Sequence, residues 1–316
     1  MLHRMTLMLT MLFAMATAAQ AQDRLSVVAT TGMIADAARQ IGGDAVAVRA
    51  LMGPGVDPHS YRQTRSDIVA MTRADLVLWH GLYLEAQMEE FFVDLDRTRT
   101  VVAVAEAIPV NLLRGNQDYE DRFDPHVWMD PLLWSRVVLE VRDTLIAVAP
   151  EHADLFTANT AAHLAELLEL ASYAQNVLST VPTEARVLLT AHDAFNYFGA
   201  AYGFEVLGIQ GISTESEAGL VRISDLVDVL VSRDIGAVFV ESSVSPRNIR
   251  ALIEGAGALG HEVVIGGELF SDAMGPDGSY EGTYLGMIDH NVSTIAAALG
   301  GQVPDAGRLG LLGEGG

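Results

Sequence analysis

Apolar and polar positions follow two alternating patterns along this chain, short β-rich runs and longer stretches with apolar residues at helical spacing. Such alternation predicts parallel strands joined by right-handed helical crossovers. It is interrupted in the middle of the chain and then starts again. The strands that we expect are Leu25–Thr30, Val46–Leu51, Leu76–Trp79 and Val101–Val104 before the interruption, and Val187–Thr190, Phe204–Gly208, Ala237–Val240 and Glu262–Ile265 after it.

The helices between these strands carry recognisable start signals. Thr64 with Asp67 three residues later is a typical helix start. Ser245 is the expected N-cap of a helix with Pro246 in its first turn. The helices that we expect in the two halves are Thr31–Ile41, Thr64–Arg73, Tyr83–Asp94, Pro131–Val148, Glu217–Ser232 and Pro246–Gly255.

The interruption is one long helical segment, Glu151–Leu178, which contains neither Gly nor Pro. At about 1.5 Å per residue it would extend for roughly 40 Å, more than one small lobe needs. We therefore predict an α/β fold of two β/α lobes with parallel-rich sheets, joined by this single rigid helix. The expected units are a first lobe at 22–149, the linking helix at 150–182 and a second lobe at 183–316.

Residues 1–21 have the pattern of a secretory signal peptide. Arg4 precedes an apolar run, Met5–Ala18, which ends in Ala19-Gln20-Ala21, so we expect cleavage after Ala21. The alternative is a membrane-anchored N-terminus, but the run is short for a membrane span. The chain has no cysteine, which excludes a disulfide and a lipid-modified N-terminal cysteine. We expect export to a bacterial periplasm without a lipid anchor.

The charge of the chain is strongly negative. The 295 residues that follow the predicted cleavage carry 41 acidic and 18 basic side chains, a net charge of −23. This balance disfavours binding to nucleic acid or anionic membranes and mildly favours attraction of cations. The acidic residues are spread along the chain, so most of them are explained by a solvated surface.

Two proline-stiffened turns each present one histidine. In Gly53–Tyr61, Pro54 and Pro58 restrict the backbone before and at the turn that carries His59. The same triplet, Asp-Pro-His, recurs and ends at His126. Imidazole is the commonest metal ligand among side chains, so a repeated stiff histidine turn suggests a metal site.

Strand ends supply partners for these two histidines, because ligands of open α/β sheets bind beyond the carboxyl ends of the strands. His192 follows the strand expected at Val187–Thr190, and Asp272 lies beyond the strand expected at Glu262–Ile265. Three imidazoles and one carboxylate suit zinc, at about 2.0–2.2 Å per ligand. With a bidentate carboxylate the same set would also suit manganese or ferrous iron.

The chain resembles the TroA-like metal-binding substrate-binding proteins of ABC transporters for zinc and manganese (cluster A-I). The resemblance covers both lobes and rests on specific motifs, namely Gly53–Tyr61, Phe123–Asp130, Thr190–Gly203, Gly211–Ala218, Val238–Ser243 and Gly266–His290.

This resemblance implies a metal site in the cleft between the lobes, with His59, His126, His192 and Asp272 as ligands. It implies capture of zinc or manganese, and iron is a further candidate, for delivery to an inner-membrane ABC permease and its ATPase. The acidic loop Arg114–Asp124 lacks the histidines typical of zinc-specific members, and manganese-specific members typically have Glu at position 192. We expect a monomeric binding protein rather than an enzyme; the alternatives are a metal-binding surface adhesin or a zinc metalloenzyme.

The remaining polar candidates are weaker. Acidic residues close in sequence to the histidines could orient the imidazoles, and a structural turn role is equally compatible with them. Glu241, at a strand end, is a less favoured candidate for the same role. We expect His80, His152, His163, His261 and His290 to be structural, and Trp128 and Tyr197 to be packing residues. The three acidic neighbours are Asp57, Asp124 and Asp193.

Overall fold

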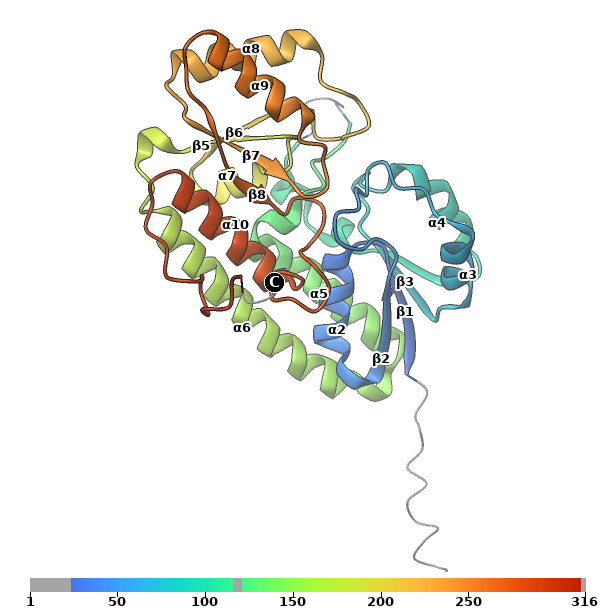
Figure 1. The fold of residues 1–316 in the computed structure, drawn as a ribbon. Helices are drawn as coiled ribbons and strands as arrows, with labels where there is room; N and C mark the ends of the chain where they lie inside the picture. The colour runs from blue at the N-terminus through green and yellow to red at the C-terminus, as the bar shows by residue number, and fades with distance from the viewer. Residues whose placement is uncertain (1–23, 116–120, 314–316) are drawn as a thin grey trace, which may run out of the picture.

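Parallel strands form the framework of the molecule, with one group in each half of the chain (Figure 1). The computed structural model describes residues 24–115 and 121–313. The predicted signal peptide at 1–21 and the middle of the acidic loop before the second histidine lie outside the described residues. Among the helices of the described part, none combines the length and the apolar character that crossing a membrane requires.

The first lobe is a helix-covered parallel sheet. Its elements are β1 (Leu25–Ala29), α2 (Gly32–Gly42), β2 (Val46–Ala50), α3 (Arg65–Arg73), β3 (Leu76–Trp79), α4 (Glu89–Leu95), β4 (Thr100–Ala103) and α5 (Pro131–Val148). The strand order is β2-β1-β3-β4. Val27 packs into the core shared with α2 and α5, whereas its neighbour Val28 packs with Met71 and Phe92 of α3 and α4. Both faces of the sheet are therefore buried, as continuous apolar strands predict.

The second lobe repeats this arrangement with two strand pairs. Its elements are β5 (Val187–Thr190), α7 (Asn196–Tyr202), β6 (Glu205–Gly208), α8 (Leu220–Ser232), β7 (Ala237–Glu241), α9 (Arg247–Ala258), β8 (Val264–Leu269) and α10 (Tyr284–Ala298). Strands β5 and β6 pair in parallel, as do β7 and β8, and β5 lies beside β7. Leu226 of α8 and Leu252 of α9 belong to the core on one face of these strands, while α10 packs against β8.

The predicted linking helix is α6 (Ala153–Leu178), which has 26 residues. It packs against α2 and α5 of the first lobe and against α10 of the second (Figure 1). Its buried residues Phe156, Leu167 and Leu170 join a single apolar core to which both lobes contribute. The α/β fold of two lobes joined by one long helix is therefore confirmed. The boundaries at 149/150 and 182/183 remain predictions.

The helix expected at Tyr83–Asp94 was wrong in its first half. Gly81, Leu82 and Tyr83 all have positive φ, between 52° and 83°, which excludes a helix there. This turn brings the Glu85 carboxylate back to accept hydrogen bonds from the backbone N–H groups of His80 and Gly81. A 3₁₀ turn at Ala86–Met88 follows, and regular α-helix begins only with α4.

The bounds of the last predicted strand, Glu262–Ile265, were also wrong, because the prediction ends four residues too early. Strand β8 continues through Gly266 and Gly267 to Leu269. Ile265 pairs with Val238 and Gly267 with Phe239, so Gly266 is the extra residue of a bulge rather than a strand end. The bulge lets the strand carry the chain closer to Asp272.

Two helix predictions also need correction, and one helix was not predicted. α8 begins at Leu220 rather than Glu217, and α7 was not predicted. The residue in the N-cap position of α9 is Pro246 and not Ser245, whose hydroxyl accepts a 3.4 Å hydrogen bond from the Arg247 N–H. By contrast, the helix start at Thr64 is confirmed, with a capping box to Asp67.

Candidate metal centre

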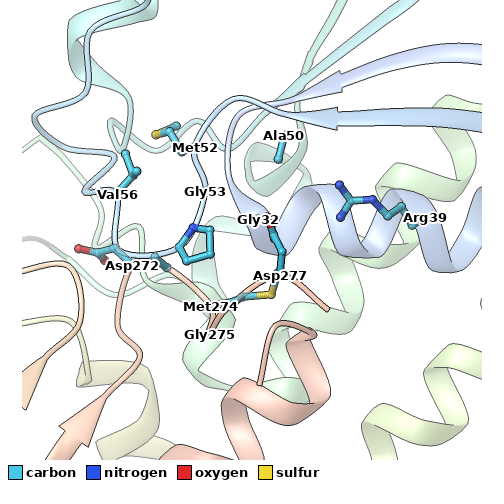
Figure 2. Close-up of a pocket in the computed structure, with 12 residues that line it drawn as sticks. Gly32, Arg39, Ala50, Met52, Gly53, Val56, Asp272, Met274, Gly275 and Asp277 are labelled. Carbon is cyan, nitrogen blue, oxygen red and sulfur yellow. The ribbon is translucent and has the colours of Figure 1, made fainter. Parts of the chain in front are cut away.

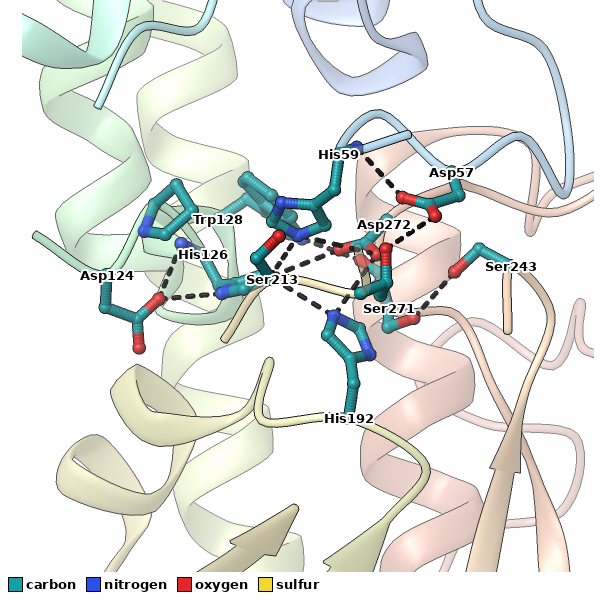
Figure 3. A network of polar contacts seen from close by, with 12 residues as sticks. Asp57, His59, Asp124, His126, Trp128, His192, Ser213, Ser243, Ser271 and Asp272 are labelled. Atoms are coloured by element: carbon teal, nitrogen blue, oxygen red, sulfur yellow. Dashed lines mark hydrogen bonds and ion pairs between the residues drawn. The ribbon is translucent and has the colours of Figure 1, made fainter. Parts of the chain in front are cut away.

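The four residues predicted from strand ends meet in one buried cluster (Figure 3). His59 and His126 come from the first lobe, and His192 and Asp272 from the second. Each offers one ligand atom, and these atoms all lie within 4.8 Å of one another. None of the four residues is more than 3% exposed. The cluster therefore lies between the two lobes, and each lobe contributes half of it.

The loop after β2 positions His59. The Asp57 carboxylate accepts a 2.9 Å hydrogen bond from the His59 backbone N–H and another from the Ser60 hydroxyl. The hydroxyl of Thr214, in the second lobe, donates to the same carboxylate at 2.6 Å. Asp57 thus holds the backbone of the histidine turn rather than its imidazole. The role of Thr214 was missed, since no local sequence signal connects it with residue 57.

A carboxylate orients the imidazole of His126. Asp124 accepts hydrogen bonds from both the Nδ1 atom and the backbone N–H of His126, at 2.7 and 2.9 Å. Asn196 donates to the second oxygen of Asp124 at 3.1 Å, and the Tyr197 hydroxyl donates to its carbonyl at 2.9 Å. With Nδ1 occupied in this way, Nε2 is the nitrogen that faces the cluster.

His192 follows β5 and is held in the same manner by Glu241 at the end of β7. The Glu241 carboxylate accepts from Nδ1 of His192 at 2.5 Å and from its backbone N–H at 2.8 Å. Asp193, although adjacent in sequence, has no hydrogen bond with the imidazole, and its Oδ1 is buried without a partner. The less favoured candidate, Glu241, therefore orients the ring, because neighbouring strand ends meet at one edge of the sheet.

Asp272 presents both carboxylate oxygens to the imidazoles. Its Oδ1 lies 3.3 Å from Nε2 of His126, and its Oδ2 lies 3.2 Å from Nε2 of His192 and 4.0 Å from Nε2 of His59. Apart from these imidazoles, no described residue pairs with either oxygen, although the side chain is fully buried. A carboxylate buried among imidazoles alone needs positive charge on its neighbours, and a bound cation would supply that charge.

Burial and neighbouring carboxylates act differently on the first two histidines. Burial lowers the pKa of His59 to about 3, so this imidazole is neutral. Burial also disfavours charge on His126, but Asp124 and Asp272 outweigh it and raise the pKa of His126 to about 9. One of the two imidazoles of the first lobe thus needs no deprotonation to bind a metal, whereas the other does.

The second lobe contains a comparable charged pair. Burial opposes charge on His192, yet Glu241 and Asp272 raise its pKa well above the usual value. Burial likewise opposes charge on Asp272, but His192 and the other imidazoles hold the pKa of this carboxyl well below its usual range. Without a metal, protons on two imidazoles therefore compensate the buried carboxylates. A divalent cation could take their place.

The spacing of the nitrogens fits a small transition-metal ion. Ligand atoms at about 2.0–2.1 Å from a tetrahedral metal lie roughly 3.3 Å from one another. The Nε2 atoms of His59 and His192 each lie 3.3 Å from Nε2 of His126. Because both oxygens of Asp272 face the imidazoles, a fifth ligand atom is within reach. The donor set is therefore suited to zinc, manganese or ferrous iron.

A separate cavity of about 180 Å³ lies beside the cluster (Figure 2). It is lined by Met52 and Gly53 of the first lobe and by Met274 and Gly275 of the second. Asp272 also borders this space, but its carboxylate is fully buried and is directed to the imidazoles. The cavity is thus next to the cluster and is not the place where the four ligand atoms converge.

Five further histidines belong to the described residues, and they lie outside the cluster. Of these, His80 is the one that contacts a turn of the cluster. It is fully buried, and its Nε2 atom is 2.7 Å from the carbonyl oxygen of Pro125, the residue before His126. It therefore supports a ligand turn rather than offering a ligand. His163 is buried on α6, and His261 and His290 are hydrogen-bonded to the backbone carbonyls of Ile235 and Glu268.

The fold and the cluster are those of a two-lobed binding protein. Two β/α lobes are joined by one helix, and a buried cluster of three histidines and one aspartate lies between them. A family model described as "Zinc-uptake complex component A periplasmic" (ZnuA) matches residues 27–298, and the chain belongs to this family.

Individual relatives are similar over nearly the whole chain. The chain is 48% identical to the "Manganese-binding lipoprotein MntA" of Bacillus subtilis over 279 residues, 88% of this chain and 91% of the relative. It is 47% identical to the "Zinc-binding protein TroA" of Treponema pallidum over 281 residues, 89% of this chain and 91% of that protein. A solved structure of Treponema pallidum TroA superposes with a TM-score of 0.85, covering 87% of this chain and 99% of that one. A third relative, the "Iron-binding protein YfeA" of Yersinia pestis, is 30% identical over 277 residues, 88% of this chain and 87% of that protein.

Proposed function

We propose that this protein captures a divalent transition metal between its lobes and delivers it to an ABC permease for import. The observation that supports this function best is the Asp272 carboxylate, which is fully buried, faces three imidazole nitrogens and pairs with no residue outside the cluster. A divalent cation compensates this charge and accepts all four ligand atoms at once. The ion is the cargo of the protein and not a catalytic cofactor.

His59, His126, His192 and Asp272 are the metal ligands in this proposal. The imidazoles bind through Nε2, because the Nδ1 atoms of His126 and His192 are directed to Asp124 and Glu241. Each lobe supplies two ligands, so binding closes the cluster and release separates its halves. The second lobe needs to move only slightly to do so, since both lobes share the core around α6.

The transported ion is zinc, manganese or iron. The donor set alone fits all three, and the relatives named above are a zinc-binding, a manganese-binding and an iron-binding protein. The choice in the cell depends on metal availability as well as on the ligand set.

The protein acts outside the cytoplasm as a monomer that meets the permease and its ATPase at the inner membrane. The predicted signal peptide, cleaved after Ala21, takes it to the periplasm. Bacillus subtilis MntA is named a lipoprotein. This chain contains no cysteine that could carry such a lipid, so we propose a protein released from the membrane.

Binding for transport is favoured over metal-dependent catalysis. A catalytic zinc normally keeps one position open for water, whereas the four side chains here complete a tetrahedral set. The family to which the chain belongs consists of components of uptake complexes. No feature of the cluster calls for a hydrolytic or adhesive role.

Metal analysis of the purified protein, followed by calorimetric competition among zinc, manganese and ferrous iron, tests this function. We expect one ion per chain, and an affinity that falls by orders of magnitude in His59→Ala and in Asp272→Ala. His152→Ala, outside the cluster, should bind normally. Retention of full affinity in both ligand variants would refute the assignment. Turnover of a hydrolysable substrate by the loaded protein would instead favour an enzyme.

A further inference from the structure

The side chain of Asp272 is held differently from the imidazoles of His126 and His192. Each of these rings contacts a buried carboxylate outside the cluster through its Nδ1 atom. Both oxygens of Asp272, by contrast, are buried and have no hydrogen-bond partner outside the cluster among the described residues. The place of this carboxylate is therefore set by the backbone that carries it, and in particular by the peptide groups of Phe270 and Ser271 directly before it.

Two side chains bind these peptide groups. Asn291, on α10 of the same lobe, accepts from the Phe270 N–H at 2.9 Å and donates to its carbonyl at 2.7 Å. The carbonyl of Ser271 accepts a 2.8 Å hydrogen bond from the indole Nε1–H of Trp128, which belongs to the other lobe (Figure 3). Trp128 is thus the side chain through which the first lobe holds the segment that carries Asp272.

Trp128 is itself tied to the other half of the cluster. It lies two residues after His126, in a 3₁₀ turn at Val127–Met129, and it is fully buried. Its ring stands edge-to-face with the imidazole of His126, with the centroids 5.2 Å apart. The Trp128 carbonyl accepts a 2.8 Å hydrogen bond from the hydroxyl of Tyr284, at the start of α10. Both its backbone and its indole are therefore fixed across the boundary between the lobes.

We propose that Trp128 is a positioning residue of the metal centre, which sets the spacing between His126 and Asp272 by binding the carbonyl of Ser271. This inference rests on the proposed function, because the spacing matters only if both residues hold one ion. A rigid indole suits this role, since ligand positions must be kept within about 0.5 Å for tight binding. Trp128 is not itself a metal ligand, and its indole N–H acts on Asp272 through the backbone of the second lobe.

The chain provides a matched pair of tryptophans for the test. Trp128→Phe keeps an aromatic ring but leaves the buried Ser271 carbonyl without its donor. Trp134 is equally buried, yet its Nε1–H has no hydrogen-bond partner, so Trp134→Phe removes an indole without removing such a bond. We expect Zn²⁺ to bind about tenfold or more weakly to Trp128→Phe, through faster dissociation, and to bind normally to Trp134→Phe.

Two further measurements separate positioning from general destabilisation. The visible absorption of bound Co²⁺, which reports ligand geometry, should change in Trp128→Phe and stay unchanged in Trp134→Phe. In an Asp272→Asn background, Trp128→Phe should cost little additional affinity, because the residue that it positions no longer binds normally. Should Trp128→Phe fail to fold, Tyr284→Phe releases the Trp128 carbonyl more gently and should weaken binding in the same direction.

Equal Zn²⁺ affinities of the two tryptophan variants would overturn the inference. A loss in Trp128→Phe that is just as large in the Asp272→Asn background would do so as well, since it would indicate an effect on the whole fold. If the unaltered chain bound neither Zn²⁺ nor Co²⁺, the proposed function would fail first, and the inference would fail with it.

Discussion

Two buried carboxylates determine which nitrogen the imidazoles present to the cluster. Asp124 and Glu241 each bind both the Nδ1 atom and the backbone N–H of one histidine, so ring and backbone are fixed together. A carboxylate in this position also raises the basicity of the ring and thereby strengthens a metal bond through Nε2.

Replacing Glu241 by Gln should therefore weaken metal binding although no ligand is changed. The amide keeps an acceptor oxygen but loses the charge that faces Nδ1 of His192. We expect a loss of about 10- to 100-fold in affinity, measured by competition with a chelator. Asp193→Asn is the matched control, because Asp193 is adjacent to the same histidine and makes no hydrogen bond with its ring. An equal loss in both variants would contradict a specific role of Glu241.

Protons should leave the cluster when the metal enters. In the free protein the pKa of His126 is raised to about 9, and the pKa of His192 is raised well above its usual value. Both imidazoles therefore carry a second proton, and a positive charge, at neutral pH. His59 and Asp272 do not, since their pKa values are lowered. We expect the release of about two protons per ion, and an affinity that rises continuously between about pH 6 and pH 8. Calorimetry in buffers of different ionisation enthalpy measures both, and binding without proton release would refute this charge distribution.

At the scale of single residues, the four residues proposed as ligands could be predicted because each follows an expected strand or a repeated Asp-Pro-His turn. The groups that hold the ligands could be predicted only in part. Asp124 is two residues from its histidine, so local spacing identifies it. Glu241 is 49 residues from His192, and its role depends on the neighbouring placement of β5 and β7. Contacts of this kind have no local signature in one sequence.

The strands and helices place these residues through the shared direction of parallel strands. The sequence pattern predicts β5 and α5 with their observed bounds, because β5 is a short apolar run rich in strand formers and α5 is a periodic stretch that ends just before Pro150. It fails at β8 and at residues 83–88. Paired glycines form a bulge in the first case, and in the second Leu82 and Tyr83 adopt positive φ in a turn that the Glu85 carboxylate holds. Both failures lie within a few residues of the cluster or of the groups that support it.

Helix α6 illustrates how an element contributes to stability without a part in the chemistry. Leu170 is fully buried in the core shared by the lobes, whereas Leu168 on the same helix is 58% exposed. Leu170→Ala should lower the free energy of unfolding by about 2–5 kcal/mol in denaturant titrations of the metal-free protein. Leu168→Ala should change it by less than about 0.5 kcal/mol. Similar values for the two variants would show that α6 does not pack as described.

On the scale of the whole molecule, the apolar cores divide the second lobe unequally. Helix α10 belongs with α6, α2 and α5 to the core that both lobes share, while α8, α9 and one face of β5 and β7 form a core of their own. Some of the contacts that cross between the lobes near the cluster are polar, such as the hydrogen bond from Thr214 to Asp57. A small movement can break such contacts while the shared core stays intact.

Metal release should therefore loosen the segment around Thr214 and leave α6 and α10 in place. We expect faster amide exchange at 211–218 in the metal-free protein, and nearly unchanged exchange in the two helices, because backbone bonds in the shared core open only with global unfolding. Thr214→Val, which removes the hydroxyl bound to Asp57, should speed metal dissociation. The control is Thr72→Val, because the Thr72 hydroxyl bonds only to carbonyls of its own helix, and this variant should leave dissociation unchanged.

Small-angle scattering should give nearly equal radii of gyration with and without metal. A wide rotation of one lobe on metal removal would contradict a core that runs continuously through both.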